Sequence, residues 1–348
     1  MRTNDVLILG IETSCDETAA AVLLNGRRLL SQVISSQTKA HAVFGGVVPE
    51  IASREHCLHL GPTVQTALSE AGVGFADLSA IAVTYGPGLV GSLLVGVAGA
   101  KAMAFAAGKP LIAVNHLEAH VYANFLEQPD LEFPLLALLV SGGHTHLVLL
   151  RRHLDCLVLG RTRDDAAGEA FDKVARALGL GYPGGPALER AAREGDPAAF
   201  FFPRAALENG SLDFSFSGLK SAVLNMLNRA RQRGDEIRLA DVAASFQQAV
   251  VDILAWKTIA ALETTGVPTL VLGGGVAANQ ALRERMQAET QARGLRFLCP
   301  APVYCTDNGA MVAVCGYFRY KEGYFADWRL NAVPGLSLHD FYKESEKM

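Results

Sequence analysis

One pattern occurs twice in this 348-residue chain and limits its possible folds more than any other feature. Each copy consists of an apolar run, a polar turn and two further strand-like segments. The copies are Val6–Ile11, Ala19–Leu24 and Arg28–Ser35, and then Leu135–Val140, Leu147–Leu150 and Cys156–Leu159. Short apolar runs bounded by turn residues are typical of buried strands, and Asn25-Gly26 predicts a tight hairpin. We therefore expect a duplicated, two-lobed α/β protein with a ligand cleft between its lobes.

Other segments fill out this architecture. Helices are predicted at Glu50–Ala71, at His116–Leu126, in a small-residue stretch that ends at Ala107, and at about 307–322; strands are predicted at Ile81–Thr84, Leu111–Val114 and Thr269–Leu272. The predicted domains are a first lobe over 1–130, a second over 131–306 and a tail over 323–348. The helix at 307–322 is expected to pack back on the first lobe.

Composition and charge exclude several classes of protein. Half of the residues are hydrophobic and 19% are charged, which suits a chain with a large core rather than a disordered one. The uncharged stretch Leu78–Ala100 contains Gly86-Pro87-Gly88, so we interpret it as a strand, a turn and a buried helix rather than a membrane span. The start has no signal-peptide pattern, and six scattered cysteines indicate reduced thiols. A soluble, cytoplasmic protein is expected.

The charge is unevenly distributed along the chain. The net charge is −4 overall, but residues 151–240 carry +2 and include Arg151-Arg152, Arg161, Arg163 and Arg229-Arg231-Arg233. An RNA could dock on this segment through its phosphates, although an ordinary solvated surface has the same composition.

The clearest indication of a metal site is the spacing of His116 and His120. On a helix, positions i and i+4 share a face, so two imidazoles there can bind one ion. A zincin protease would need its glutamate directly after the first histidine, where this chain has Leu117, and Glu118 would lie on the wrong face. Asp307 is the preferred third ligand and Cys305 a weaker rival. His56 and His59 are interpreted as structural, and two histidines on a solvated face remain the alternative.

Two loops have the composition of phosphate-binding turns. Ser141-Gly142-Gly143-His144-Thr145 follows one predicted strand, and Gly273-Gly274-Gly275 followed by Asn279 comes after another. Glycines let a ligand approach the backbone, and the amides at a helix N-terminus favour anions. Neither loop matches a Walker A or a dinucleotide-binding motif, and a simple tight turn remains the alternative.

Acidic residues supply the other candidates. Glu12, Asp16 and Glu17 gather in the turn after the first strand, where acids can position magnesium, water or a nucleophile. Asp172 is a candidate for ribose hydroxyls, and Glu189 follows the rigid turn Tyr182–Pro186. Helix-dipole and turn roles are the alternatives.

Ten motifs, in order from about residue 8 to 315, resemble the TsaD/Gcp family, formerly called O-sialoglycoprotein endopeptidases. They are GIETSCDET, GGVVPEIASREH, TYGPGLVGSL, NHLEAH, LVSGGHT, GEAFDKVAR, YPGGP, FSFSGLKSAV, LGGGVAAN and CTDNGAM. The resemblance implies an ASKHA (actin-like ATPase, Hsp70 and sugar kinase) fold with a central nucleotide cleft. It also implies transfer of a threonylcarbamoyl group from threonylcarbamoyl-AMP to N6 of the adenosine 3′ of the anticodon in ANN-decoding tRNAs, with release of AMP.

The resemblance also implies roles for individual residues and for partners. His116, His120 and Asp307 would hold one divalent metal, Fe²⁺ ahead of Zn²⁺. The adenylate, and with it ATP or ADP, would be bound by Val140, Ser141, Gly142, Gly143, His144, Asp172, Gly185, Glu189 and Asn279. Glu12 would act near the reaction centre, and we interpret it as the general base. The implied partners are tRNA, TsaB-like and TsaE-like proteins in a bacterial setting, and a TsaC-like synthase that supplies the donor.

Two alternatives stay open at this point. A degenerate paralogue would only scaffold a transferase, and such paralogues lack the histidine pair that this chain has. An actin-like small-molecule kinase would share the fold without needing the metal ligands.

Overall fold

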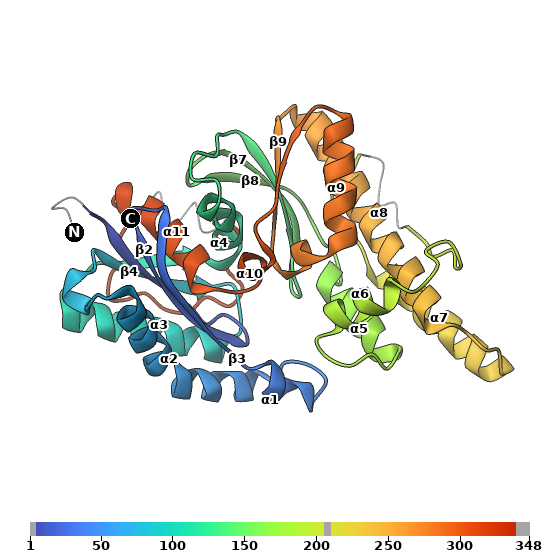
Figure 1. The fold of residues 1–348 in the computed structure, drawn as a ribbon, viewed down its shortest axis with the longest axis horizontal. Helices are drawn as coiled ribbons and strands as arrows, with labels where there is room; N and C mark the ends of the chain where they lie inside the picture. The colour runs from blue at the N-terminus through green and yellow to red at the C-terminus, as the bar shows by residue number, and fades with distance from the viewer. Residues whose placement is uncertain (1–4, 205–209, 339–348) are drawn as a thin grey trace. The chain divides into compact units, whose positions relative to one another are not determined.

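The computed structural model describes residues 5–204 and 210–338, and the chain folds as two compact units (Figure 1). The first unit contains residues 1–133, 152–156 and 300–348, and the second contains 134–151 and 157–299. The predicted tail is described up to residue 338. Residues 1–4, 205–209 and 339–348 lie outside the described part.

The first unit is built on a five-stranded sheet in the order β3-β2-β1-β4-β5. Its strands are β1 (Leu7–Glu12), β2 (Glu17–Leu24), β3 (Arg28–Ser36), β4 (Ala80–Gly86) and β5 (Leu111–Asn115). β1 pairs antiparallel with β2 and parallel with β4. Every residue of β1 is buried, which explains its unbroken apolar sequence, because a central strand covered on both faces needs no polar side.

The second unit repeats this arrangement. Its sheet has the order β10-β9-β6-β7-β8, so β6 takes the central place that β1 has in the first unit. The strands are β6 (Leu135–Val140), β7 (Thr145–Arg152), β8 (Asp155–Arg161), β9 (Thr269–Gly273) and β10 (Arg296–Leu298). β6 pairs antiparallel with β7 and parallel with β9. The predicted duplication therefore appears as two sheets of equivalent strand order.

Helices complete each unit. The first contains α1 (Thr38–Ala42), α2 (Pro49–Ala71), α3 (Val90–Ala107), α4 (His116–Tyr122), α10 (Pro302–Cys305) and α11 (Gly309–Lys321), with short 3-10 turns at Phe75–Asp77 and Ala123–Leu126. The second contains α5 (Ala167–Ala177), α6 (Gly184–Ala192), α7 (Ser217–Arg233), α8 (Leu239–Thr265) and α9 (Gln280–Ala292), with a 3-10 turn at Gly275–Ala278. The predicted helix at His116–Leu126 is thus an α-helix followed by a tighter turn.

α11 packs on the sheet of the first unit, and small residues make this close packing possible. α11 packs on β1, β2 and β4. A Cβ on Gly10 of β1 would lie 2.3 Å from the carbonyl oxygen of Gly309, and one on Gly316 would lie 2.5 Å from Cβ of Ala82. Side chains at these glycines would push the helix off the sheet. α11 consequently lies against the strands directly, and this fixes the position of the loop that precedes it.

α3 consists almost entirely of small and apolar residues. By length and hydropathy, Val90–Ala107 is the single helix in the described residues that could cross a membrane. A core helix passes the same test, and α3 packs against β4 and α2 through a face that includes Leu93, Val97 and Ala104. These contacts agree with the predicted strand, turn and helix at Leu78–Ala100.

Candidate metal centre and ligand-binding loops

The first turn of α4 presents two histidines to one point in space. Asn115, the last residue of β5, caps the helix by accepting hydrogen bonds from the backbone N–H groups of Leu117 (2.9 Å) and Glu118 (3.2 Å). The cap begins the helix at His116, so His116 and His120 lie one turn apart with their ring centroids separated by 4.6 Å. Both are buried. The predicted i, i+4 pairing is therefore present.

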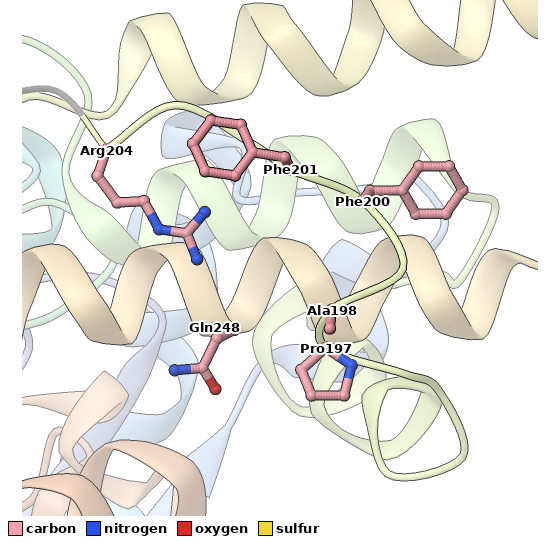
Figure 2. Close-up of a pocket in the computed structure, with 6 residues that line it drawn as sticks. All are labelled: Pro197, Ala198, Phe200, Phe201, Arg204 and Gln248. Carbon is pink, nitrogen blue, oxygen red and sulfur yellow. The ribbon is translucent and has the colours of Figure 1, made fainter.

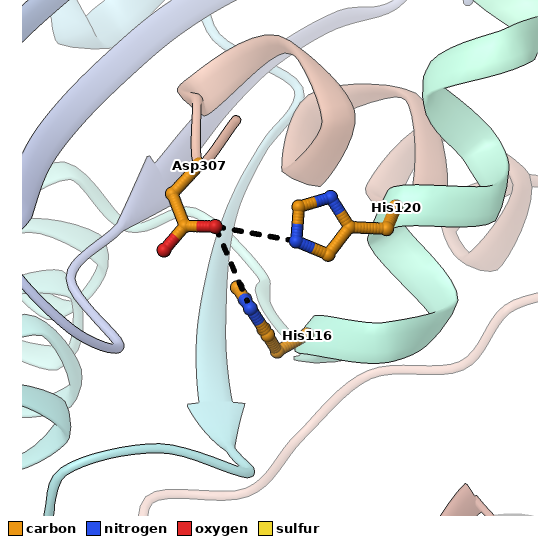
Figure 3. Close-up of side chains that lie close together, drawn as sticks. All are labelled: His116, His120 and Asp307. Carbon is orange, nitrogen blue, oxygen red and sulfur yellow. Dashed lines mark ion pairs between the residues drawn. The ribbon is translucent and has the colours of Figure 1, made fainter. Parts of the chain in front are cut away.

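Asp307 completes a three-residue group with these histidines (Figure 3). It lies just before α11, whose first turn is capped by Asn308 rather than by Asp307. Its Oδ1 is 3.2 Å from Nε2 of His120 and 3.6 Å from Nε2 of His116. One ligand atom from each residue lies within 4.8 Å of the others, so the three could hold a metal ion. We call these three residues the metal group.

The surroundings of His120 are compatible with a bound cation. His120 is 2% exposed; its Nδ1 has no hydrogen-bond partner among the described residues, and its Nε2 makes no hydrogen bond there, although it lies 3.2 Å from Oδ1 of Asp307. A buried polar atom without a partner is costly, and a coordinated metal would remove that cost at Nε2. Two imidazoles and one carboxylate are also an ordinary ligand set for a divalent transition metal.

Glu12 lies behind His116 and fixes the orientation of its ring. The carboxylate is fully buried; its Oε2 is 3.2 Å from Nδ1 of His116 and accepts a hydrogen bond from the Thr84 hydroxyl at 2.6 Å. Its Oε1 accepts the backbone N–H of Ser14 at 2.5 Å, and the Ser14 hydroxyl lies 3.1 Å from the same His116 nitrogen. A carboxylate on Nδ1 leaves Nε2 of His116 directed to Asp307, as in carboxylate–histidine–metal arrangements.

The electrostatics of the group favour positive charge. Burial lowers the pKa of His116, but the carboxylates of Asp307 and Glu12 outweigh it and raise that pKa to about 9. Burial raises the pKa of Glu12, but the charge and hydrogen bond of His116 bring it below its usual value. The protein environment therefore stabilises a cation at this position.

The other sequence candidates around the centre have different roles. Sγ of Cys305 lies 3.5 Å from the carbonyl oxygen of Pro300, and Cys305 is not part of the metal group. His56 is fully buried, with Nδ1 2.7 Å from the Thr18 hydroxyl and Nε2 2.9 Å from the carbonyl oxygen of Cys15. Glu118 points away from the histidines and pairs with Arg319 at 2.8 Å. The spacing argument against a zincin mechanism agrees with this orientation.

Ser14 and Thr84 were absent from the sequence candidates. Thr84 comes next to Glu12 because β1 and β4 pair in parallel with Ile11 opposite Val83. The contact between Thr84 and Glu12 depends on the register of two strands that are far apart in the sequence, so no local sequence pattern predicts it. Ser14 belongs to the polar, acidic turn after β1, and this position is the one sequence feature that points to a role for it at the site.

In the second unit, the predicted phosphate loop follows β6 and folds on itself. The Ser141 N–H donates to the carbonyl of His144 at 2.8 Å, and the His144 N–H donates to the Ser141 hydroxyl at 3.2 Å. A Cβ on Gly142 or Gly143 would meet no atom within 4 Å, and both glycines are exposed. Packing within the described chain does not require glycine there, so the open space beside the loop is available to a ligand.

The remaining predicted residues of the second unit are linked to this loop through contacts between neighbouring elements. A Cβ on Gly274 would lie 2.4 Å from the carbonyl of Val140, and the Gly168 N–H donates to the carbonyl of Ser141 at 3.1 Å. Asp172, on the helix that begins beside Gly168, accepts the Gly184 N–H at 2.9 Å and the Gly185 N–H at 3.3 Å.

The series ends at the N-terminus of α9. Glu189 accepts the N–H of Gln280 at 3.0 Å, and Asn279 caps the helix by accepting the N–H of Leu282 at 3.0 Å. Asn279 also donates to the side-chain oxygen of Gln247 at 2.9 Å. The structure thus brings Val140–His144, Asp172, Gly185, Glu189 and Asn279 into one region, and it also gives Asp172, Glu189 and Asn279 helix-capping roles.

A separate hollow lies elsewhere on the second unit and contains none of the predicted residues. It has a volume of about 360 Å³ and is lined by Pro197, Ala198, Phe200, Phe201, Arg204 and Gln248 (Figure 2). The Arg204 guanidinium lies 5.5 Å from the centre of the Phe201 ring, and it also pairs with Asp252 at 2.9 Å. These contacts occupy the arginine, so the hollow offers little free charge to a ligand.

Comparison with known proteins identifies close relatives. Residues 28–314 match the family model described as TsaD, tRNA N6-adenosine threonylcarbamoyltransferase. A protein of that description from Desulfitobacterium hafniense (strain Y51) is 67% identical over 338 residues, which cover 97% of this chain and 99% of the relative. Another from Moorella thermoacetica is 56% identical over 332 residues, covering 95% and 97%.

More distant solved structures share the fold. HypF of T. kodakarensis has a TM-score of 0.64 at 17% identity, covering 92% of this chain and 48% of HypF. The activator of the 2-hydroxyisocaproyl-CoA dehydratase from Clostridium difficile has a TM-score of 0.53 at 14% identity, covering 91% and 97%. Both are ASKHA-fold proteins, and the likeness confirms the predicted fold class.

Proposed function

The chain belongs to the TsaD family of tRNA N6-adenosine threonylcarbamoyltransferases, and from this premise we propose which of its residues bind and transfer the group. The activity itself is that of its close relatives: a threonylcarbamoyl group is placed on N6 of an adenosine in tRNA. A pure scaffold and a small-molecule kinase are therefore set aside.

We propose threonylcarbamoyl-AMP as the donor and the adenosine 3′ of the anticodon in ANN-decoding tRNAs as the acceptor. The N6 amine attacks the carbamoyl carbon, the bond from that carbon to the phosphate oxygen breaks, AMP leaves, and N6 loses one proton. The anhydride is already activated, so a covalent enzyme intermediate is not required. The protein has to position the two reactants and to stabilise charge on the carbonyl oxygen.

We assign the metal to His116, His120 and Asp307. Support comes from their shared ligand point and from buried His120, whose ring nitrogens make no hydrogen bond with the described residues while its Nε2 faces the Asp307 carboxylate at 3.2 Å. Two histidines and one carboxylate suit both Fe²⁺ and Zn²⁺; we propose Fe²⁺ first because the resemblance to the family implies it. When bound, such an ion supplies a Lewis acid that can polarise a carbonyl or a phosphoryl oxygen.

For Glu12, the hydrogen bonds support a positioning role rather than the general-base role expected from sequence. Both carboxylate oxygens already accept hydrogen bonds from Thr84, Ser14 and His116. In this role Glu12 keeps a proton on Nδ1 of His116 and leaves Nε2 free to bind the metal.

Glu12→Gln separates the two roles. A positioning residue predicts metal affinity weakened about 10–100-fold, with transfer restored at high metal concentration. A general base predicts normal metal content and a transfer rate that added metal does not restore. Metal titration followed by single-turnover transfer measures both. Thr84→Ser, which keeps the hydroxyl, is the matched control.

We assign adenylate binding, and with it any binding of ATP or ADP, to the second unit. Gly142 and Gly143 offer exposed backbone, a Cβ on Gly185 would also meet open space, and Asp172, Glu189 and Asn279 hold the surrounding helix ends. Gly143→Ala should weaken binding of a donor analogue about tenfold or more without lowering thermal stability, because a Cβ there would meet no atom within 4 Å. Calorimetry with the analogue and a melting curve give both readings.

Protein partners of the bacterial type are also proposed. α2 and α3 expose Leu58, Leu94 and Phe105 on the first unit, with Phe105 74% exposed. Exposed apolar side chains of this kind mark association surfaces, which suits a TsaB-like subunit. A TsaE-like protein and a TsaC-like synthase would complete the reaction sequence in the cytoplasm. Leu94→Glu and Phe105→Glu should each abolish association in gel filtration, while the exposed Leu157→Glu should not.

The convergence of ligand atoms from His116, His120 and Asp307 within 4.8 Å carries the assignment of the metal centre. The decisive experiment is a transfer assay containing threonine, bicarbonate, ATP, a donor-making synthase and unmodified tRNA, with wild type, His116→Ala and His120→Ala. Both variants should lose metal and transfer together. Undiminished metal content in both variants would contradict the assignment, whatever happens to transfer.

A further inference from the structure

α7 differs from the other helices of the second unit in its charge. Ser217–Arg233 contains Lys220, Arg229, Arg231 and Arg233 and has no acidic residue. It lies within residues 151–240, whose net charge is +2. In Figure 1, α7 (yellow) lies in the second unit, away from the strands of that unit's sheet.

The structure divides the arginines of this basic segment into two kinds. Several are already neutralised: Arg152 pairs with Asp155 at 3.3 Å, Arg163 with Asp213 at 2.8 Å and Arg238 with Asp241 at 3.1 Å. By contrast, Arg229, Arg231 and Arg233 are exposed and make no ion pair with any residue that the structure describes. Net charge along the sequence does not reveal this difference.

The exposed side of α7 is uniformly polar. Ser221, Asn225, Arg229, Gln232 and Arg233 follow one another at helical spacing and are all exposed. We call these five residues, with Asn228 and Arg231 at the edges, the basic face of α7. Hydroxyl, amide and guanidinium groups are the side chains that contact phosphate and sugar oxygens in nucleic acids.

The opposite side of the helix is fixed to the unit. Leu219, Val223 and Ala230 are buried. At the first turn, Asp164 accepts hydrogen bonds from the hydroxyls of Ser215 and Ser217, and Lys220 pairs with Asp165. The N-terminal cation is therefore used internally, and the anchored helix presents its three C-terminal arginines to solvent.

Helix electrostatics alone do not account for this arrangement. Cations near a helix C-terminus interact favourably with the helix dipole, which applies to Arg231 and Arg233 in the last turn. Asp235 and Glu236 follow beyond the Gly234 cap and are exposed, so they limit the basic surface to the helix itself. The dipole leaves unexplained why the whole exposed side lacks an acid.

We infer that the basic face of α7 binds the sugar–phosphate backbone of the tRNA substrate. The inference rests on the proposed function, since tRNA is the polyanion that this enzyme must hold. The face contains no aromatic side chain on which a base could stack, so the contact is to the backbone and is independent of nucleotide sequence.

The test compares two triple variants that lose the same charge. The test variant is Arg229→Gln with Arg231→Gln and Arg233→Gln. The control variant is Arg152→Gln with Arg163→Gln and Arg238→Gln, which removes arginines already paired with acids. Binding of labelled, unmodified tRNA to the full-length protein and its assembly is measured by anisotropy from low to physiological salt.

The test variant should bind tRNA about 10–100-fold more weakly at low salt. Its slope of log affinity against log salt should be smaller in magnitude by about 2, since each lost phosphate contact removes about 0.7–0.9. In the transfer assay KM for tRNA should rise while kcat and metal content stay unchanged. The corresponding triple lysine variant should recover most of the affinity, and the control variant should keep the wild-type slope.

Two results would overturn the inference. Equal weakening in the test and control variants would mean that only net charge matters, and an unchanged slope in the test variant would mean that RNA does not contact α7. If the wild-type protein binds and modifies tRNA and either of these results is obtained, only this inference is wrong. If the wild-type protein neither binds nor modifies tRNA, the proposed function is wrong as well.

Discussion

At the residue scale, the metal group shows how buried polar side chains can be interpreted. His120 is buried without a hydrogen bond from any described residue, whereas His116 is held by Glu12 and Ser14. The two imidazoles therefore have different surroundings although they share one helix face. The position of the His120 ring, which the protein holds with fewer hydrogen bonds, should therefore depend more on the bound metal than that of the His116 ring.

This difference gives a prediction for His120→Asn and His116→Asn. In metal-free protein, His120→Asn should cost less stability than His116→Asn, because His120 makes no hydrogen bond with the described residues and its one polar contact is with the partly exposed carboxylate of Asp307. His116→Asn should cost about 1–3 kcal/mol, since it leaves buried Glu12 without one partner. Urea unfolding of metal-free protein measures both. A larger loss for His120→Asn would contradict the interpretation.

His146 on β7 gives a pH prediction that is independent of the metal. Burial, and secondarily the charge of Arg161, lower its pKa to about 4. The unfolded chain, with a pKa near 6.5, takes up the proton first, so protonation favours unfolding. Stability from this group should be complete above pH 6.5 and lost between 6.5 and about 4, on the order of 2 kcal/mol given its partial exposure.

Denaturant midpoints against pH test this expectation. His146→Gln should flatten the decrease between pH 6.5 and 4, whatever its effect on stability at pH 8. Leu157→Gln, at an exposed position on β8 that does not titrate, is the control and should leave the slope unchanged. An acid slope identical to wild type in His146→Gln would refute the assignment.

At the element scale, the metal group depends on two helices that meet through a buried ion pair. Glu118 of α4 and Arg319 of α11 are 2.8 Å apart, with their side chains 1% and 3% exposed. α4 carries both histidines, and Asp307 immediately precedes Asn308, the cap of α11. The pair therefore joins the two elements that supply the metal ligands.

Breaking this pair should affect both stability and metal binding. Arg319→Met leaves Glu118 buried and uncompensated and should destabilise the protein by about 3–5 kcal/mol, whereas Glu118→Leu with Arg319→Met should recover most of that loss. Chemical denaturation and metal titration of both variants give the measurement. If the single variant is as stable as the double variant, the pair does not hold the helices together.

At the scale of the whole molecule, the chain comprises two units with equivalent sheets but different candidate ligand-binding residues. The metal group lies entirely in the first unit, and the predicted adenylate residues lie entirely in the second. A ligand that binds only the folded state stabilises the unit that holds it. Metal removal should therefore act on one unit.

The only two tryptophans make this testable, because Trp328 belongs to the first unit and Trp256 to the second. A chelator should lower the unfolding midpoint reported by Trp328 in a Trp256→Phe variant. It should leave the midpoint reported by Trp256 in a Trp328→Phe variant unchanged. The difference should approach about 2.7 kcal/mol at a metal concentration of 100 Kd. Equal shifts at both tryptophans would show that the metal stabilises both units.

The sequence by itself determined the local parts of this protein. The strands of both sheets except β10 (Arg296–Leu298), the Asn25-Gly26 turn and the i, i+4 histidine pair follow from side-chain periodicity and turn chemistry between near neighbours. The spacing also excluded a zincin mechanism before any coordinates were needed. Ordered motifs named the family and nominated Asp307.

Tertiary structure decided everything that depends on distance between remote segments. Asp307 meets the histidines because small residues, Gly10 and Gly316 among them, let α11 lie directly on the sheet. Thr84 reaches Glu12 through parallel strand register, and the α7 arginines differ from Arg163 only in having no acid beside them. The hydrophobic periodicity of a sequence indicates which side of a helix or strand is buried. Which residue that side contacts depends on how the helices and strands pack together.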